Sequence, residues 1–454
     1  MNVYVNRTLN LKRINYIGFD MDHTLVRYHT KEFERVAHQL MLEKLVKTKD
    51  YPEAILNLPF EFDRAIRGLV IDKTHGNVLK LSRHGAIRLS YHGLNPIDYK
   101  LQKKIYKSTY VDLSSPNYDT VDTNFSIAFA SLYSQLVELK DSTEYQSLPD
   151  YYQIAQDLIS VLDEAHRDDS LKSIVRNNIE KYIIKDEDTV RGLERFKKHG
   201  KKLFLLTNAD YFYTKTLLDY AINPFLKEHK SWEDLFIFVI TFAQKPRFFY
   251  DNLRFLKINP KDGSMTNIST PISPGIYQGG SASAFTNDLN LDPSEILYIG
   301  DHIYGDIVRL KKDCAWRTAL VVEELEHEIE SAIKTKPIAE KIQKLMEQKI
   351  PLEIKVDQLI SEQIEKNAKN KEAVEKTLQK ISQLDAEIRP LIKEQDKAYN
   401  PYWGEIMRTG IEESFFAYQI ERYACIYMSK ISDFLNVSPR TYFRAFYRKL
   451  PHEP

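Results

Sequence analysis

Four short apolar stretches along the chain have the pattern of strands that are buried on both faces. They start at residues 14, 201, 234 and 295 and read "INYIGF", "KKLFLL", "DLFIFVI" and "EILYIG". Nearly continuous apolar runs of this length are typical of the inner strands of a parallel sheet, which helices cover on both sides. Segments with helical spacing, such as "KEFERVAHQLMLEKLVKTKD" and "YTKTLLDYAI", supply the crossovers that parallel strands need. The pattern predicts an α/β fold built on a Rossmann-like parallel sheet.

The block between residues 66 and 185 interrupts this alternation. The stretch "RGLVIDKTHGNVLKLSRHGAIRLSYHG" places short β-rich runs between the turn signals "HGN" and "HGA", which predicts a meander of about three antiparallel strands. From residue 151 to about 185 the spacing of apolar residues is helical again. We therefore expect an inserted α+β cap at 66–185, between two parts of the core at 1–65 and 186–325.

The chain beyond about residue 322 is charged and helical in pattern. Apolar residues recur there at helical spacing, at Val374, Leu378, Ile381, Ile388 and Leu391. This spacing predicts a helical hairpin, and the aromatic-rich segment at 412–434 predicts a further helix. We expect residues 326–454 to form a helical extension that packs on the core, with self-association as a second role.

The amino-acid composition limits the kinds of binding partner and the cellular compartment that we expect for this protein. Lysine and arginine together number 64, as do aspartate and glutamate, so no overall charge attracts nucleic acid or an anionic membrane. The two cysteines, Cys314 and Cys425, lie far apart and suggest neither a disulfide framework nor a zinc site. The N-terminus lacks the apolar core of a signal peptide, and no apolar run is long enough to cross a bilayer. These features predict a cytoplasmic protein.

Polar residues follow each of the four predicted strands, in "DMDHT", "TNAD", "QKPRFF" and "GDHIYGD". Because ligands of an open parallel sheet bind at the carboxyl ends of its strands, these distant groups are expected to converge. Neighbouring carboxylates repel each other unless a cation relieves them, and hard oxygen ligands favour Mg²⁺ over zinc. We expect the metal to be held by Asp20, Asp301 and Asp306, with Asp22 contributing through its backbone carbonyl.

The remaining groups at these strand ends suit a phosphate ligand. Lys245 supplies a fixed positive charge, and Thr207 and Asn208 can donate hydrogen bonds to phosphate oxygens. A helix expected after "TNAD" would direct its amide dipole at the same anion. Gly300 and Gly305 permit a tight loop that turns both later carboxylates inward.

These parts predict a phosphoryl-transfer mechanism. Asp20 attacks phosphorus in line to give an aspartyl phosphate, while the metal and Lys245 balance the equatorial charge. Asp22 protonates the leaving oxygen and later activates water. Each motif taken alone occurs often by chance, but four in this order, each beside an apolar strand, favour a single active site.

The motifs "GFDMDHTL", "LLTNADYFYT", "QKPRFF" and "YIGDHIYGDI" resemble the haloacid dehalogenase (HAD) superfamily, and within it the cytosolic purine 5′-nucleotidase family. The similarity extends to "KYIIKD", "QIERYACIY" and "LPHE", and is weakest at 325–400. The resemblance implies a HAD core and Mg²⁺-dependent hydrolysis of IMP and GMP, with phosphate transfer to other nucleosides as an additional activity. It also assigns Asp20, Asp22, Thr207, Asn208, Lys245, Asp301 and Asp306 to the catalytic motifs.

The family resemblance also implies a base pocket on the insert, in "QDLISVLDEAHRDDSLKS". There Asp163 can accept two hydrogen bonds from guanine, His166 can stack on the purine, and Lys172 can hold the nucleotide. GMP is therefore expected to be favoured. Two positions depart from the family pattern: Ile159 stands where an arginine is common, and Ala209 replaces a hydroxyl residue.

A second nucleotide site and a homo-oligomer, dimer or tetramer, are further implications of the resemblance. A purine nucleotide effector would contact an aromatic and basic set of residues, Tyr304, Lys312, Gln419, Arg422 and Tyr423. Two other functions remain open from the sequence. One is a HAD phosphatase for another small phosphate ester, because catalytic loops do not choose the leaving group. The other is a non-catalytic purine-nucleotide sensor, against which the intact aspartate pair argues.

Overall fold

The computed structural model describes the chain except residues 1, 108–110, 269, 451 and 454. Contacts divide the chain into two units, which are residues 1–323 with 407–454, and residues 324–406. The sheet that carries the predicted strands, and both cavities discussed below, lie in the first unit.

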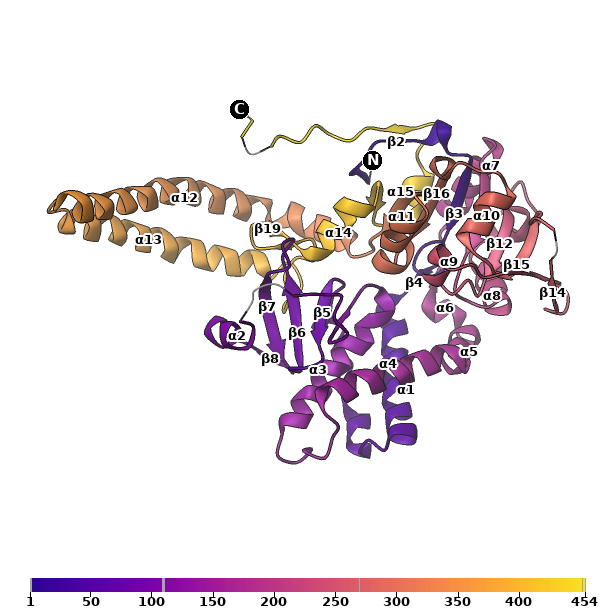
Figure 1. Ribbon diagram of the computed structural model, residues 1–454, viewed down its shortest axis with the longest axis horizontal. Helices are drawn as coiled ribbons and strands as arrows, with labels where there is room; N and C mark the ends of the chain where they lie inside the picture. The colour runs from indigo at the N-terminus through magenta and orange to yellow at the C-terminus, as the bar shows by residue number, and fades with distance from the viewer. Residues whose placement is uncertain (1, 108–110, 269, 451, 454) are drawn as a thin grey trace. The chain divides into compact units, whose positions relative to one another are not determined.

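A ten-stranded sheet forms the core of the first unit. Its parallel strands are, in spatial order, β20 (Ile426–Met428), β17 (Arg317–Val321), β16 (Ile296–Gly300), β3 (Tyr16–Phe19), β11 (Lys202–Leu206), β12 (Phe236–Thr241) and β15 (Gly275–Gly279). Antiparallel strands close the edges, with β1 (Val3–Val5) beside β20, and β13 (Phe255–Ile258) and β14 (Met265–Asn267) beyond β15. The four predicted strands are therefore adjacent in the middle of the sheet, and the α/β prediction is confirmed (Figure 1).

Close packing explains why these strands are apolar. Phe204, Phe285 and Trp316 are fully buried and contact one another on one side of the sheet. A Cβ atom on Gly18 would lie 2.2 Å from the Phe204 ring, so only glycine fits at this position of β3. Helices connect and cover the strands: α7 (Glu187–Lys198), α8 (Tyr211–Ala221), α9 (Arg247–Tyr250), α10 (Ala282–Asp288) and α11 (Arg309–Asp313).

The insert contains a second, antiparallel sheet. The predicted meander forms β5 (Leu69–Asp72), β6 (Asn77–Leu81) and β7 (Ile87–His92), flanked by β8 (Asn95–Pro96) and β9 (Tyr118–Thr120). Helices α3 (Ile127–Asp141) and α4 (Tyr151–Arg167) pack on α1 (Thr30–Lys49), and α5 (Ser170–Asn177) and α6 (Ile179–Tyr182) follow. The short helix α2 (Tyr99–Ile105) lies after β8, and β4 (Arg27–Tyr28) pairs with β10 (Ile183–Ile184).

The C-terminal part departs from the prediction of one continuous helix at 412–434. Helix α14 (Phe415–Tyr423) ends at Ala424, which is extended, and β20 then enters the parallel sheet between β17 and β1. The helix prediction is wrong at 426–428 because the apolar run there is buried against sheet neighbours on both sides. A short helix follows, α15 (Ile431–Leu435), and two small ribbons complete this part, β2 (Leu9–Asn10) with β21 (Tyr442–Phe443) and β18 (Arg408–Thr409) with β19 (Glu412–Glu413).

The second unit is the predicted helical hairpin. Helices α12 (Leu325–Lys366) and α13 (Lys371–Asp396) pack along each other, and Asn367 ends α12 in a left-handed conformation at φ +51°. The Lys349 Nζ and Asp385 Oδ1 atoms join the two helices at 2.8 Å. Within the described residues, neither these helices nor any other combine the length and apolar character that crossing a bilayer requires.

Candidate active site

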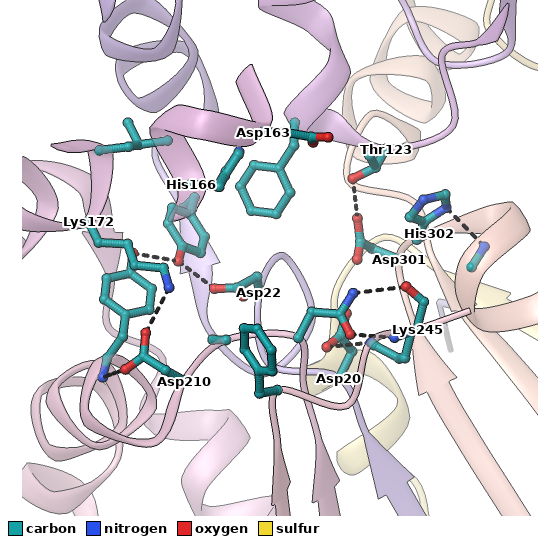
Figure 2. A pocket seen from close by; sticks show the side chains of 18 of the residues that line it. Asp20, Asp22, Thr123, Asp163, His166, Lys172, Asp210, Lys245, Asp301 and His302 are labelled. Atoms are coloured by element: carbon teal, nitrogen blue, oxygen red, sulfur yellow. Dashed lines mark hydrogen bonds and ion pairs between the residues drawn. The ribbon is translucent and has the colours of Figure 1, made fainter. Parts of the chain in front are cut away.

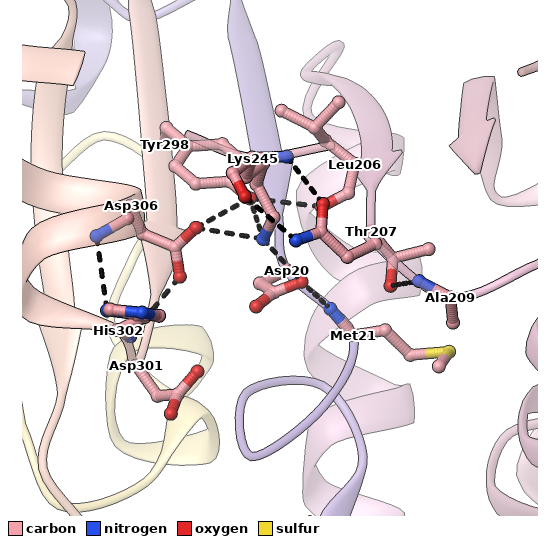
Figure 3. A network of polar contacts seen from close by, with 12 residues as sticks. Asp20, Met21, Leu206, Thr207, Ala209, Lys245, Tyr298, Asp301, His302 and Asp306 are labelled. Carbon is pink, nitrogen blue, oxygen red and sulfur yellow. Dashed lines mark hydrogen bonds and ion pairs between the residues drawn. The ribbon is translucent and has the colours of Figure 1, made fainter. Parts of the chain in front are cut away.

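Three carboxylates and one ammonium group meet at the carboxyl ends of the central strands. Asp20 follows β3, Asp301 follows β16, and Asp306 lies one helical turn further along the chain. The Lys245 Nζ atom, from the loop after β12, lies 2.7 Å from Asp20 Oδ1 and 2.8 Å from Asp306 Oδ1. Carboxylate oxygens of the three aspartates lie within 4.8 Å of one another, and all three side chains are buried (Figure 3). Four groups separated by nearly 300 residues thus form one cluster.

Burial makes this cluster electrostatically strained without a cation. Burial raises the pKa of Asp20 well above its ordinary value, and the neighbouring Asp306 and Asp301 charges add to this effect while Lys245 opposes it. Burial also raises the pKa of Asp301. Although burial alone would lower the pKa of Lys245, the charges of Asp20 and Asp306 raise it. Lys245 at Asp20, and His23 and Arg67 at Asp301, only partly oppose the effect of burial, and the three sets of hard carboxylate oxygens fit a divalent cation such as Mg²⁺.

Asp306 reaches the cluster from a wide helical turn and not from the predicted tight loop. Residues 303–308 form a π-helical turn, which displaces the side chain of Asp306 toward the end of β16. The backbone N–H of His302 donates to Asp306 Oδ2 at 3.2 Å. A Cβ atom on Gly300 would lie 2.3 Å from the same oxygen, so glycine is required there for close approach.

Neighbouring residues hold Lys245 in position. Its Nζ atom donates to the Tyr298 hydroxyl at 3.0 Å, and that hydroxyl donates to the Leu206 carbonyl at 3.0 Å. The Asn208 side chain accepts from the Lys245 N–H at 2.6 Å and donates to the Lys245 carbonyl at 3.0 Å. Asn208 is therefore engaged with the lysine loop, in addition to lining the cavity described below.

Thr207 lies deeper than its predicted role requires. Its side chain is fully buried, and its oxygen accepts a hydrogen bond from the Ala209 N–H at 3.1 Å. Ala209 and Asn208 line the cavity, and Thr207 is absent from the lining among the described residues. The structure thus places the side chain of Thr207 behind the residues that line the cavity.

A cavity of about 630 Å³ opens from the carboxylate cluster toward the insert. Asp163, His166 and Lys172, the three residues predicted to bind the nucleotide, line the same cavity as Asp20 and Lys245 (Figure 2). Clefts of this size commonly hold small ligands of nucleotide dimensions. The structure therefore brings the predicted phosphate end and the predicted base end into one space.

The insert end of the cavity combines aromatic rings with charged side chains. The rings of His166 and Phe125 lie edge to face, with centroids 5.6 Å apart. Burial, together with Lys172, lowers the pKa of His166 to about 4, so the imidazole is neutral near pH 7. Lys172 Nζ is paired with Asp210 Oδ2 at 2.7 Å, and burial raises the pKa of Asp163.

Asp22 lies apart from the carboxylate cluster. Its Oδ1 atom accepts a hydrogen bond from the Tyr28 hydroxyl at 2.6 Å, and it lines the cavity. Burial raises the pKa of Asp22, and the Tyr28 bond partly opposes this. Among the described residues, the group that could hold a metal through side chains comprises Asp20, Asp301 and Asp306, which leaves Asp22 its backbone carbonyl as the predicted metal contact.

The sequence did not predict a buried group of polar side chains around Glu323, beside the loop that follows β3. Glu323 Oε2 accepts from Thr30 Oγ1 at 2.9 Å and Asn124 Nδ2 at 3.0 Å, and lies 3.4 Å from His23 Nδ1. Burial opposes protonation of His23, but Glu323 raises its pKa to about 9. These hydrogen bonds connect the loop after β3 to the segment that carries Phe125. No motif in the sequence indicated this connection.

A second cavity of about 570 Å³ lies behind the same π-helical turn. All five residues predicted for an effector line it: Tyr304, Lys312, Gln419, Arg422 and Tyr423. The Lys312 ammonium and the Arg422 guanidinium lie 5.7 Å and 5.4 Å from the centroid of the Tyr423 ring. Tyr304 precedes Asp306 by two residues, so one short turn borders both cavities.

The chain is similar to known proteins over its whole length. Over 100% of its length the chain is 28% identical to a 5′-nucleotidase domain-containing protein of Dictyostelium discoideum, of which it covers 75%. It is 26% identical to the human 5′-nucleotidase domain-containing protein 2, over 99% of this chain and 84% of that protein.

Among solved structures, a predicted phosphoglycolate phosphatase from Haemophilus somnus matches 68% of the chain and 86% of its own, with 11% identity and a TM-score of 0.28. A magnesium-bound protein from Bacillus subtilis, the putative HAD-hydrolase YfnB, matches 68% of the chain and 89% of its own, with 13% identity and a TM-score of 0.24. The model of the 5′ nucleotidase family matches residues 3–454, and the chain therefore belongs to that family.

Proposed function

We propose that the protein is a Mg²⁺-dependent 5′-nucleotidase that hydrolyses purine nucleoside 5′-monophosphates, with GMP and IMP favoured. Lys245 lies between Asp20 and Asp306 at one end of the cavity, and Asp163 and His166 line the same cavity. This arrangement supports the proposal. A phosphate beside the lysine would leave its nucleoside directed toward the ring pair of His166 and Phe125.

The reaction follows from the chemistry of the two aspartates. An oxygen of Asp20 attacks phosphorus, the bond between phosphorus and O5′ breaks, and Asp22 gives its proton to the departing oxygen. Asp22, now ionised, takes a proton from water as the water attacks phosphorus and releases phosphate from Asp20. The raised pKa of Asp22 favours the protonated form that the first step needs.

The cation supplies charge neutralisation for the phosphoryl group when it is bound. Asp20, Asp301 and Asp306 provide side-chain oxygens for it, and the carbonyl of Asp22 completes the proposed protein ligands. Lys245 stays paired with Asp20 and Asp306 and offers its positive charge to the phosphate. Transfer of the phosphate to a nucleoside would use the same steps, with a nucleoside hydroxyl in place of water.

Asp163 supports the preference for guanine. A carboxylate can accept hydrogen bonds from N1 and the 2-amino group of guanine together, whereas hypoxanthine offers N1 alone. The neutral His166 and Phe125 provide apolar ring surface for the purine.

The second cavity suits a purine nucleotide effector. Its aromatic and cationic lining matches a base and phosphates, and Tyr304 and Asp306 share one turn through which occupancy could alter the metal cluster. Activation of the wild type by GTP or ATP that is lost in Lys312→Ala would support this second site.

A substrate panel tests the proposal and separates it from its alternatives. Phosphate release is measured with Mg²⁺ from GMP, IMP, AMP, CMP and several sugar phosphates, with Asp20→Asn and a chelated sample as controls. The proposal predicts the highest kcat/KM for GMP and IMP, and no release in either control. A sugar phosphate as best substrate would indicate another HAD phosphatase. Nucleotide binding without release would indicate a sensor.

A further inference from the structure

Tyr28 is hydrogen-bonded to Asp22, the proposed general acid. Its hydroxyl donates to Asp22 Oδ1 at 2.6 Å, a length typical of a strong hydrogen bond to a carboxyl oxygen. Both residues line the 630 Å³ cavity, and Tyr28 itself is only 3% exposed. Figure 2 marks this hydrogen bond where it reaches Asp22. The contact is thus buried and directed at the group that must move a proton.

The surroundings of Tyr28 keep its ring in one orientation. Its backbone belongs to β4 and pairs with Ile183 of β10. Its ring stacks on His23 with centroids 4.7 Å apart, and meets the edge of Phe33 at 5.1 Å. The hydroxyl of Tyr213 lies 3.4 Å away, and because the Tyr28 proton is directed to Asp22, Tyr213 is the donor of that weaker contact. A side chain packed on several sides can fix the geometry of its partner.

We infer that Tyr28 is a positioning residue that determines which oxygen of Asp22 exchanges the proton. Because Oδ1 accepts from Tyr28, the proton of the carboxylic acid resides on Oδ2. That oxygen is the one left to serve the departing O5′ in the first step and the attacking water in the second. Without the tyrosine hydroxyl the carboxyl group can rotate, and the proton is no longer presented in one direction.

The inference rests on the proposed function and is tested through the leaving group. Wild type and Tyr28→Phe are compared with GMP and with the analogue in which sulfur replaces the bridging O5′. A thiolate departs without protonation, whereas the ribose oxygen needs a proton from Asp22. We expect kcat/KM of Tyr28→Phe to fall by about 10- to 100-fold for GMP and by less than about threefold for the sulfur analogue.

Tyr51→Phe is a matched control. The Tyr51 hydroxyl donates to Asp157 Oδ2 at 3.1 Å in a buried position outside the cavity lining, so the control loses the same kind of bond. Tyr51→Phe should leave the ratio of kcat/KM for GMP to kcat/KM for the sulfur analogue unchanged. Tyr213→Phe removes the donor to Tyr28. It should lower kcat/KM for GMP relative to the sulfur analogue, as Tyr28→Phe does, but by a smaller factor. This variant tests the inference if Tyr28→Phe does not fold.

Three outcomes would overturn the inference. An equal loss on both substrates would indicate a purely structural role for Tyr28, and an unchanged GMP rate would show that Asp22 needs no such support. Either result leaves the proposed function intact, since the wild type still cleaves GMP. A wild type that cleaves neither substrate would overturn the proposed function and the inference with it.

Discussion

At the scale of single residues, the two aspartates of the first motif differ because their surroundings differ. Asp20 pairs with Lys245 inside the carboxylate cluster, whereas Asp22 is held by a neutral phenol outside it. One is therefore suited to attack as a carboxylate near a cation, and the other to carry a proton.

Replacement of Asp22 by asparagine tests this division. Asp22→Asn keeps the shape and the Tyr28 contact but cannot move a proton, so kcat for GMP should fall by about 10²- to 10⁴-fold. The thermal unfolding midpoint, and its rise on adding Mg²⁺, should stay close to those of the wild type, because Asp22 lies outside the carboxylate group. Turnover near the wild-type value would refute the proton-transfer role.

The proposed preference for guanine depends on Asp163. Asp163→Ala removes both proposed acceptors for guanine and should lower kcat/KM for GMP by about 10- to 100-fold, as expected for a lost charged hydrogen-bond pair. AMP, which offers no N1–H or 2-amino group, should change by less than about threefold. The comparison is made by steady-state kinetics on both nucleotides. Equal losses for the two would show that Asp163 acts only through packing.

At the scale of elements, the apolar pattern predicted most of the core, and local order explains the exceptions. The strands β3, β11, β12 and β16, the helix α1 and the hairpin of α12 and α13 follow directly from periodicity. Strand β20 was not predicted because "CIYM" is so short that the spacing of its apolar residues does not distinguish a strand from a helix. Only its place in the sheet, between β17 and β1, decides the conformation.

Glu34 links helix α1 to helix α3 of the insert, and its burial makes the stability of the protein depend on pH. From α1, its Oε2 accepts the Ala128 N–H at the start of α3 at 2.7 Å. Burial raises the pKa of Glu34 from 4.5 to about 8, against the opposing effects of the Ala128 bond and His23. The folded protein therefore keeps a proton that the unfolded chain releases above pH 4.5. This contribution to stability is complete below pH 4.5 and is lost as the pH rises to about 8.

Glu34→Gln should remove that dependence, because the amide keeps the acceptor for Ala128 and carries no charge. The free energy of unfolding, from denaturant titrations between pH 5 and 8.5, should become larger in the variant than in the wild type by about 1–3 kcal/mol at the upper end. Glu32→Gln, on the more exposed side of α1, is the control and should give a curve parallel to the wild type. Parallel curves for Glu34→Gln as well would contradict the assignment.

In the whole molecule, residues that are distant in the sequence meet in one site, and the sequence could indicate this meeting only in part. The rule that ligands bind at the carboxyl ends of parallel strands was enough to suggest that Asp20, Lys245 and Asp301 would meet, as the structure shows. Tyr28, Phe125 and Glu323 were missed, because their partners lie on other elements and their residue types are common in cores and turns. Such contacts follow from tertiary packing and carry no local signal.

In the proposed reaction, these converging groups allow Asp20 to attack phosphorus and form an aspartyl phosphate. The most direct measurement mixes the protein with Mg²⁺ and GMP labelled in its phosphate, stops the reaction with acid within one turnover, and maps the label by mass spectrometry. We expect a hydroxylamine-sensitive acyl phosphate on the peptide that contains Asp20, and no label on the Asp20→Asn protein. Phosphate release without label on Asp20, or with label on another residue, would contradict it.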